Sequence, residues 1–143
     1  MRAIAALLLI LVTPVQAQNG WPDLDRLLYG TLTASGRAEA SFWLPDQGDP
    51  ATATRALGIV YEAFPGGNAT SIATGLYQRT TQGWQFAGIV QGLFGQSPRD
   101  IAFAPTHIDI TTTMLGPGEP RCCPTRVTRW RIDLANRVAQ RLN

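Results

Sequence analysis

The chain has no lysine, a single histidine and only two cysteines among its 143 residues. All twelve basic residues are arginines, and ten acidic residues leave a formal net charge of +2. A protein this close to neutral is not a nucleic-acid binder by bulk charge. Six arginines nevertheless fall in the last 23 residues, so the C-terminal part is locally basic. Coding bias explains the missing lysine, and guanidinium groups that bind a carboxylate or a phosphate are the functional alternative.

The chain also lacks the motifs of familiar catalytic and metal sites. His107 and Asp109 are two residues apart and share one face of a predicted strand, which is half of a hydrolase triad. No Gly-x-Ser-x-Gly stretch supplies the serine, so an exposed histidine is the simpler interpretation. The two adjacent cysteines lack the spacing of a structural zinc site and of a thioredoxin-like motif. We therefore predict no catalytic residue, no cofactor and no metal site.

Residues 3–12 are all apolar and follow the short basic start Met1-Arg2. This run is too short to cross a bilayer, which takes about 20 residues. Val15-Gln16-Ala17 then gives the small-x-small pattern that a signal peptidase recognises. We predict a signal peptide over residues 1–17 and a soluble periplasmic or secreted protein with no membrane contact after cleavage. The remaining residues, 18–143, suit one domain with a sizeable core.

Helix signals are confined to the start of this predicted domain. Pro22 and Asp23 suit a first helical turn, leucines at positions 24, 27 and 28 share one face, and Gly30 is expected to end the helix. Strand patterns occupy residues 37–44, 55–64, 69–79, 84–94, 106–115 and 126–134. We predict a mainly β fold, an antiparallel sheet of about five to seven strands with one short N-terminal helix; an α+β fold is the alternative.

Turn chemistry predicts how some of these strands pair. Thr81-Gln82-Gly83 makes a tight turn, so residues 69–94 are expected to form a β-hairpin. In the last strand Thr128, Trp130 and Ile132 alternate with charged residues, which indicates one buried and one solvated face. The strands at 106–115 and 126–134 are then neighbours joined by a long, proline-stiffened connection. Residues 95–100 are predicted to be a loop.

That connection holds the most unusual stretch, residues 116–125, which read GPGEPRCCPT and are called the Cys-Cys loop below. In an oxidising compartment Cys122 and Cys123 have only each other as partners within the chain. A disulfide across two residues closes so small a loop that it adds only about 1 kcal/mol. Three interpretations stay open: a disulfide that shapes a turn, two buried reduced thiols, or a functional pair serving as redox switch, soft-metal dithiol or ligand platform.

Residues 114–128, reading MLGPGEPRCCPTRVT, resemble a C-terminal signature of uncharacterised exported bacterial proteins. Its pattern is Gly-Pro-x-Asp/Glu-Pro-x-Cys-Cys-Pro-Thr followed by a strand, and the strand pattern upstream is more loosely similar. The resemblance implies an exported domain in which the Cys-Cys turn is a shared feature. It implies no activity and no catalytic residue.

Together these patterns predict a non-enzymatic exported domain with a binding or accessory role. Its partner is an unknown envelope protein or a small anionic ligand, and nucleic acid is not expected. Two arrangements of the charged residues are expected as alternatives. In one, Glu119 pairs with Arg121. In the other, Arg121, Arg126 and Arg99 converge on a bound anion. The alternatives are a redox- or soft-metal-responsive vicinal dithiol and an inhibitor of a secreted hydrolase that inserts one rigid loop. The candidate contact or redox residues are Glu119, Arg121, Cys122, Cys123, Arg126 and Trp130.

Overall fold

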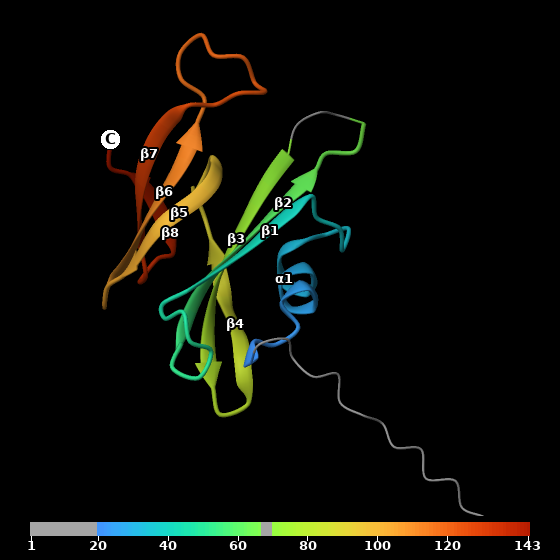
Figure 1. The fold of residues 1–143 in the computed structure, drawn as a ribbon, viewed down its shortest axis with the longest axis vertical. Coiled ribbons are helices and arrows are strands. Elements are labelled where there is room, and N and C mark those ends of the chain that lie inside the picture. The colour runs from blue at the N-terminus through green and yellow to red at the C-terminus, as the bar shows by residue number, and fades with distance from the viewer. Residues whose placement is uncertain (1–19, 67–69) are drawn as a thin grey trace, which may run out of the picture.

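The computed structural model describes residues 20–66 and 70–143, so the predicted signal peptide at 1–17 lies outside the described residues. Eight strands form two four-stranded antiparallel sheets, and one short helix lies beside the first sheet (Figure 1). The predicted mainly β class with one N-terminal helix is confirmed. The division of the strands into two sheets was not predicted.

Each sheet follows chain order, so every strand pairs with its neighbour in sequence. The N-terminal sheet contains β1 (Ala40–Pro45), β2 (Arg55–Ala63), β3 (Thr70–Thr80) and β4 (Gly83–Val90). The C-terminal sheet contains β5 (Gln96–Phe103), β6 (His107–Met114), β7 (Arg126–Asp133) and β8 (Val138–Arg141). With the helix α1 (Leu24–Leu32) outside the N-terminal sheet, the molecule has three layers (Figure 1).

Helix α1 begins at an Asp cap and lies against the sheet on two leucines. The Asp23 carboxylate accepts a hydrogen bond from the Arg26 N–H at 3.0 Å, which satisfies one of the free donors of the first turn. Leu28 and Leu32 are buried. Gly58 of β2 makes this contact possible, because a Cβ on Gly58 would collide with Leu28. Gly30 does not end the helix as predicted, since the chain stays helical to Leu32.

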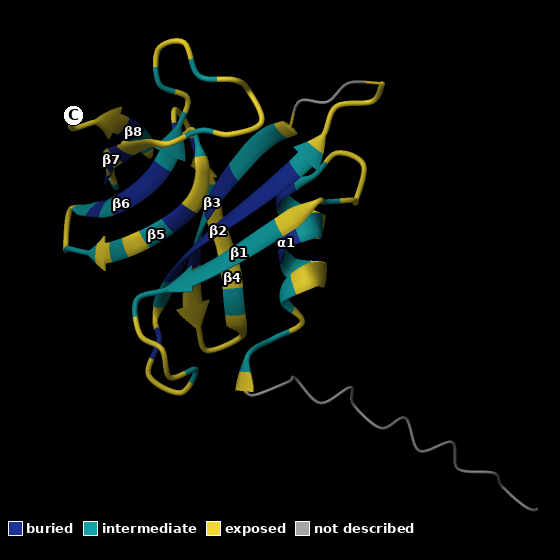
Figure 2. Ribbon diagram, turned by 45° about the horizontal axis from the view of Figure 1, so that its top comes forward, coloured by how far each residue is buried: buried dark blue, intermediate teal, exposed yellow. Residues whose placement is uncertain are grey.

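The main core lies between the two sheets. From the N-terminal sheet it takes Leu57 and Ile59, and from the C-terminal sheet Ile108, Ile110 and Ile132, all at most 2% exposed. The opposite face of β2 presents Ala56 and Val60 to α1. Strand β2 is therefore buried on both faces (Figure 2), which explains why its sequence is a continuous apolar run rather than an alternation.

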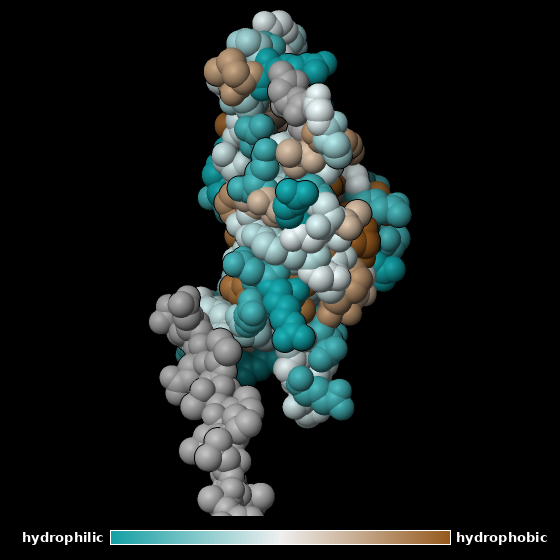
Figure 3. Space-filling model, turned by 90° about the vertical axis from the view of Figure 1, so that its right-hand side faces the viewer, coloured by the Kyte–Doolittle hydropathy of each residue, from teal (hydrophilic) through white to brown (hydrophobic). Residues whose placement is uncertain are grey.

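An aromatic cluster closes the space between α1 and the N-terminal sheet. The Trp43 ring lies 5.1 Å from both the Tyr77 and the Trp84 rings, and Trp21 contacts both tryptophans. Trp43 and Trp84 therefore belong to the packing between α1 and the N-terminal sheet. On the outer surface of this side, hydrophilic residues dominate and hydrophobic areas are separate from one another (Figure 3).

Both predicted strand pairings are present. Strands β3 and β4 form the hairpin, with Thr80 opposite Gly83 at its turn. Strands β6 and β7 are neighbours on either side of the Cys-Cys loop. In β7 Thr128, Trp130 and Ile132 are buried while the residues between them are exposed, as the alternation indicated.

Two strands of the C-terminal sheet were missed. The predicted loop at residues 95–100 falls largely within β5, an edge strand with two register shifts. Ser97 and Asp100 adopt positive φ angles of 51° and 52° there, and Pro98 lies between them. Such residues signal a turn in the sequence, but in this protein they form bulges at a sheet edge. Strand β8 has only four residues, too few for a clear alternation.

Candidate functional site

The Cys-Cys loop joins the ends of β6 and β7 and projects from one end of the C-terminal sheet (Figure 1). Its conformation is organised by the carboxylate of Glu119. This carboxylate accepts hydrogen bonds from the Gly116 N–H at 2.8 Å, from the Thr125 N–H at 3.0 Å and from the Thr125 hydroxyl. Because Gly116 and Thr125 are the first and last residues of the loop, Glu119 ties its two ends together.

The hydrogen bonds that Glu119 accepts stabilise its ionised form. Those from the Thr125 hydroxyl, the Gly116 N–H and the Thr125 N–H hold the pKa of Glu119 below its ordinary value. The expected pairing with Arg121 is not seen, since the ion pairs of the described residues do not include these two. Arg121 is exposed and its guanidinium is left available to other groups.

Cys122 and Cys123 form a disulfide between adjacent residues, with their Cα atoms 3.8 Å apart. The Cys123 N–H donates to the Pro120 carbonyl at 3.1 Å, so the pair lies in a closed turn. Both cysteines are exposed, which contradicts the alternative of two buried thiols. The arrangement agrees with the disulfide-shaped turn and places both cysteines at the surface.

Beneath the loop, two adjoining hollows form a cleft at the open end of the sandwich, which we call the inter-sheet cleft. The first has a volume of 260 Å³ and is lined by residues that include Tyr61, Ile72, Phe94, Met114, Arg121 and Pro124. The second, of 220 Å³, shares Tyr61, Thr70 and Gln96 with the first and is also lined by Phe42 and by the carboxylate residue Glu39, so the anion site proposed below is confined to the first hollow. The Cys-Cys loop contributes Arg121 and Pro124, so one cationic side chain adjoins a mostly apolar wall.

The base of the cleft is held by two hydrogen bonds to the segment between β4 and β5. The Tyr61 hydroxyl donates to the Gly95 carbonyl at 2.7 Å, and the Thr112 hydroxyl donates to the Phe94 carbonyl at 2.7 Å. Burial raises the pKa of Tyr61 to about 12, so this phenol is neutral at physiological pH. Sequence patterns did not identify Tyr61 or Phe94, because each looks like an ordinary strand aromatic.

Trp130, predicted as a contact residue, is buried in the core at 4% exposure. Its indole N–H donates to the Thr112 hydroxyl at 2.8 Å, and that hydroxyl in turn binds the Phe94 carbonyl. Trp130 therefore supports the cleft from behind and is not a surface for a ligand. Trp130 is close to the Cys-Cys loop in sequence, but the alternation of β7 places its side chain on the inner face.

The three arginines expected to converge do not share one site. Arg121 lines the inter-sheet cleft. Arg99 of β5 donates to the Ser97 carbonyl at 2.9 Å and to the Thr113 hydroxyl at 3.0 Å, so its guanidinium is engaged along the sheet. Arg126 is exposed at the start of β7 and does not line either hollow of the cleft. Of these arginines, Arg121 alone borders the cleft.

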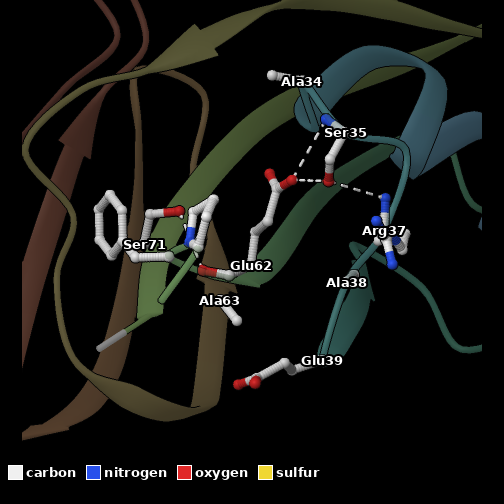
Figure 4. A pocket seen from close by; sticks show the side chains of 10 residues that line it. Ala34, Ser35, Arg37, Ala38, Glu39, Glu62, Ala63 and Ser71 are labelled. Carbon is white, nitrogen blue, oxygen red and sulfur yellow. Dashed lines mark hydrogen bonds between the residues drawn. The ribbon is translucent and has the colours of Figure 1, made fainter. Parts of the chain in front are cut away.

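A larger hollow of 730 Å³ lies where the turn after α1 meets the ends of β2 and β3 (Figure 4). Of its two carboxylate residues, Glu39 and Glu62, Glu62 accepts hydrogen bonds from the Ser35 hydroxyl and from the Ser35 N–H. The chain's single histidine, His107, lies in β6 of the other sheet, so no imidazole is present to accept a proton from Ser35. We assign Ser35 and Glu62 to fixing the turn between α1 and β1.

His107 and Asp109 share a face of β6, as predicted, but the Asp109 carboxylate is bound elsewhere. Arg131 donates two hydrogen bonds to it, each at 2.8 Å, and His107 lies 3.9 Å away. The Arg131 hydrogen bonds hold the pKa of Asp109 below its ordinary value. This cluster stabilises the outer face of the C-terminal sheet.

Among the described residues, no three His, Cys, Asp or Glu side chains are grouped so that they could hold a metal ion. Within the same residues, no helix has the length and apolar character needed to span a membrane. Comparisons with protein-family models, curated proteins and solved structures find no match for this chain. The resemblance to exported proteins with a Cys-Cys signature therefore stays a prediction.

Proposed function

We propose that this chain is an exported, non-enzymatic binding protein that takes a small amphipathic anion in the inter-sheet cleft. The observation that carries the proposal is the position of Arg121 at the edge of an apolar hollow. Arg121 lines this hollow together with Ile72, Phe94 and Met114, and its guanidinium has no carboxylate partner among the ion pairs of the described residues. Apolar walls with one well-placed charged group are the usual composition of a ligand pocket.

The Cys-Cys loop gives this site its preorganisation. Glu119 holds both ends of the loop, and the Cys122–Cys123 disulfide closes the turn next to Arg121. A rigid loop loses less conformational freedom when a ligand binds, which favours affinity. A guanidinium binds a carboxylate or a phosphate through parallel hydrogen bonds, so the head group of the ligand is expected to be one of these anions.

The test is an NMR titration with octanoate, with octyl phosphate as the second anion and 1-octanol as the neutral ligand of equal chain length. Both anions are expected to shift the amide signals of residues around Phe94 and Met114. Arg121→Gln should weaken octanoate binding about tenfold and leave octanol binding unchanged. Arg129→Gln, an exposed arginine of β7 that lines neither hollow, is the matched control and should change neither.

Equal binding of octanoate to the Arg121→Gln variant would contradict the proposal, and so would absence of any shift at the cleft. If the cleft takes no ligand while an envelope protein binds the loop, the accessory role replaces the small-ligand role. Export is tested separately by the intact mass of the protein from cells, which should begin at Gln18 if residues 1–17 are removed.

A vicinal dithiol is the second candidate, because both cysteines are adjacent, exposed residues. Alkylation of the purified protein separates the two functions. Labelling only after reduction supports a disulfide that shapes the turn. Labelling without reduction favours the dithiol, and titration with a soft metal ion is then the next measurement.

A further inference from the structure

The two hollows of the inter-sheet cleft carry opposite charges. Among the described residues, Arg121 is the one charged residue that lines the first hollow, and Glu39 is the one that lines the second. The hollows adjoin each other, because Tyr61, Thr70 and Gln96 line both of them. A ligand that extends through both hollows therefore meets a cationic group at one end and an anionic group at the other.

These two charges do not neutralise each other. The ion pairs of the described residues include neither Arg121 nor Glu39. Within the same residues, no hydrogen bond reaches the Glu39 carboxylate, whose residue is held through its N–H to the Tyr61 carbonyl at 2.8 Å. Figure 4 shows the Glu39 carboxylate pointing away from the hydrogen bonds between Ser35 and Glu62. The carboxylate is thus open to a partner from outside the chain.

An open carboxylate is unusual in this protein, because nearly all the acidic side chains are engaged by other groups. Those that accept hydrogen bonds or pair with arginine are Asp23, Asp46, Asp49, Glu62, Asp100, Asp109, Glu119 and Asp133. Asp25 of α1 is the other acidic residue that has no such partner among the described residues, and it lines neither hollow. Glu39 alone combines an open carboxylate with a place in the cleft.

The other lining residues of the second hollow suit an ammonium group. The rings of Phe42 and Tyr61 meet edge to face, with their centroids 5.9 Å apart. The Tyr61 hydroxyl donates to the Gly95 carbonyl, so the polar end of this side chain is occupied and its ring is left for apolar contact. Aromatic rings and a carboxylate are the groups with which proteins bind substituted ammonium ions.

We propose that the second hollow binds the ammonium group of a zwitterionic ligand, whose anionic group binds Arg121 in the first hollow. The zwitterionic class rests on the proposed function, because the anion at Arg121 fixes the other end of the ligand. In a cleft without a partner for it, an added ammonium group would weaken binding, since its desolvation is not compensated. With Glu39 as its partner, the same group strengthens binding. The sign of the change in affinity separates the two cases.

NMR titration with octanoate, octylammonium and ω-aminooctanoate, three probes of equal chain length, tests the proposal. The shorter ω-aminohexanoate and ω-aminobutanoate cover smaller separations of the two charges. At the best length, the ω-amino acid is expected to bind about tenfold tighter than the carboxylate of equal length. Glu39→Gln should remove this advantage without weakening octanoate binding. Asp25→Asn is the matched control, since Asp25 is an exposed carboxylate outside the cleft, and it should change neither.

Amide shifts locate the ammonium group. Its binding should shift the signals of Phe42 and Ser97, which line the second hollow. Shifts confined to Ala34 and Ala63 would place it in the hollow of 730 Å³, which Glu39 also lines, and would overturn the proposal. So would ω-amino acids that bind no tighter than carboxylates of equal length, although octanoate binding would then leave the proposed function intact. Octylammonium binding that depends on Glu39, with no binding of octanoate, would reject the anion function and support the ammonium site.

Discussion

At the scale of single residues, one carboxylate accepts hydrogen bonds from three donors at the two ends of the Cys-Cys loop. Glu119 accepts from the Gly116 N–H, the Thr125 N–H and the Thr125 hydroxyl. Hydrogen bonds to an ionised acceptor are about twice as strong as neutral ones. The loop's shape therefore depends on the charge of this side chain.

We expect Glu119→Gln to loosen the loop without unfolding the domain. The amide side chain keeps one acceptor oxygen but loses the charge and turns an NH₂ group towards the donors. Hydrogen exchange at Gly116 and Thr125 should become faster, on the order of tenfold. Glu39→Gln is the control, because Glu39 is exposed and its carboxylate accepts no hydrogen bond from the described residues. Unchanged exchange at both amides would refute this role for Glu119.

The site residues differ in how far the sequence could identify them. The sequence around the cysteines identified the loop and Arg121 as a candidate site, because prolines, glycines, charged residues and both cysteines are concentrated there. The hydrogen-bond partners of Glu119 could not be predicted from the sequence, because they depend on a loop conformation that brings Gly116 and Thr125 to the same carboxylate. Phe94 joins the cleft only because Thr112 and Tyr61 of two different sheets hold the segment that carries it.

At the scale of elements, the Cys-Cys loop is held at its ends by Glu119 and in its middle by the disulfide. These two constraints act on different parts of the loop. A two-residue disulfide ring restricts the unfolded chain very little. Its contribution is therefore to the local turn that presents Arg121, and little of it should appear in the stability of the whole domain.

Replacing both cysteines, Cys122→Ser with Cys123→Ser, should lower the free energy of unfolding by about 1 kcal/mol or less. Thermal unfolding followed by circular dichroism measures this, and the expected decrease of the midpoint is roughly 2–5 °C. Octanoate binding should weaken only mildly if the disulfide shapes the turn. Complete loss of function with an unchanged midpoint would instead support the dithiol function, and a decrease far above this range would show that the disulfide holds the fold.

Elements with regular periodicity were predictable and irregular ones were not. Strand β7 alternates cleanly because its outer face meets water. Strand β5 resembles a loop because its bulges use positive-φ residues and a proline. The second sheet could not be inferred at all, since alternation shows that one face is buried but not what covers it. In the structure each sheet covers the inner face of the other, as Leu57 of β2 and Ile110 of β6 show by belonging to the same core cluster.

At the scale of the whole molecule, three carboxyl groups in separate regions have lowered pKa values. Burial would raise the pKa of Asp46, but hydrogen bonds from Thr54 and the nearby Arg55 lower it. Arg131 lowers that of Asp109, and donors from Thr125 and Gly116 lower that of Glu119. A carboxyl with a lower pKa in the folded state stabilises the fold above its unfolded pKa. That contribution is lost as the pH falls through the folded value.

The unfolding midpoint should therefore be constant from neutral pH down to about pH 5 and fall below about pH 4.5. Asp109→Asn should lower the free energy of unfolding at pH 7 by up to about 1 kcal/mol, because the Arg131 pair is partly exposed. The difference from wild type should shrink as the pH falls through the lowered folded-state pKa of Asp109 and vanish once the carboxyl is protonated in both states. Calorimetry across this range measures both effects. A constant Asp109→Asn deficit at all pH values would contradict the assignment.

Because every strand pairs with its neighbour in sequence, each sheet can assemble by adding one hairpin at a time. No strand of either sheet pairs with a strand that is distant in the sequence, so the entropic cost of closing long loops is small. Contacts of short sequence separation are associated with rapid folding among β proteins. The two meanders meet through the isolated pairing of Gln91 with Val138 and through the core between the sheets. The contacts of long sequence separation are then mainly those that join one meander to the other.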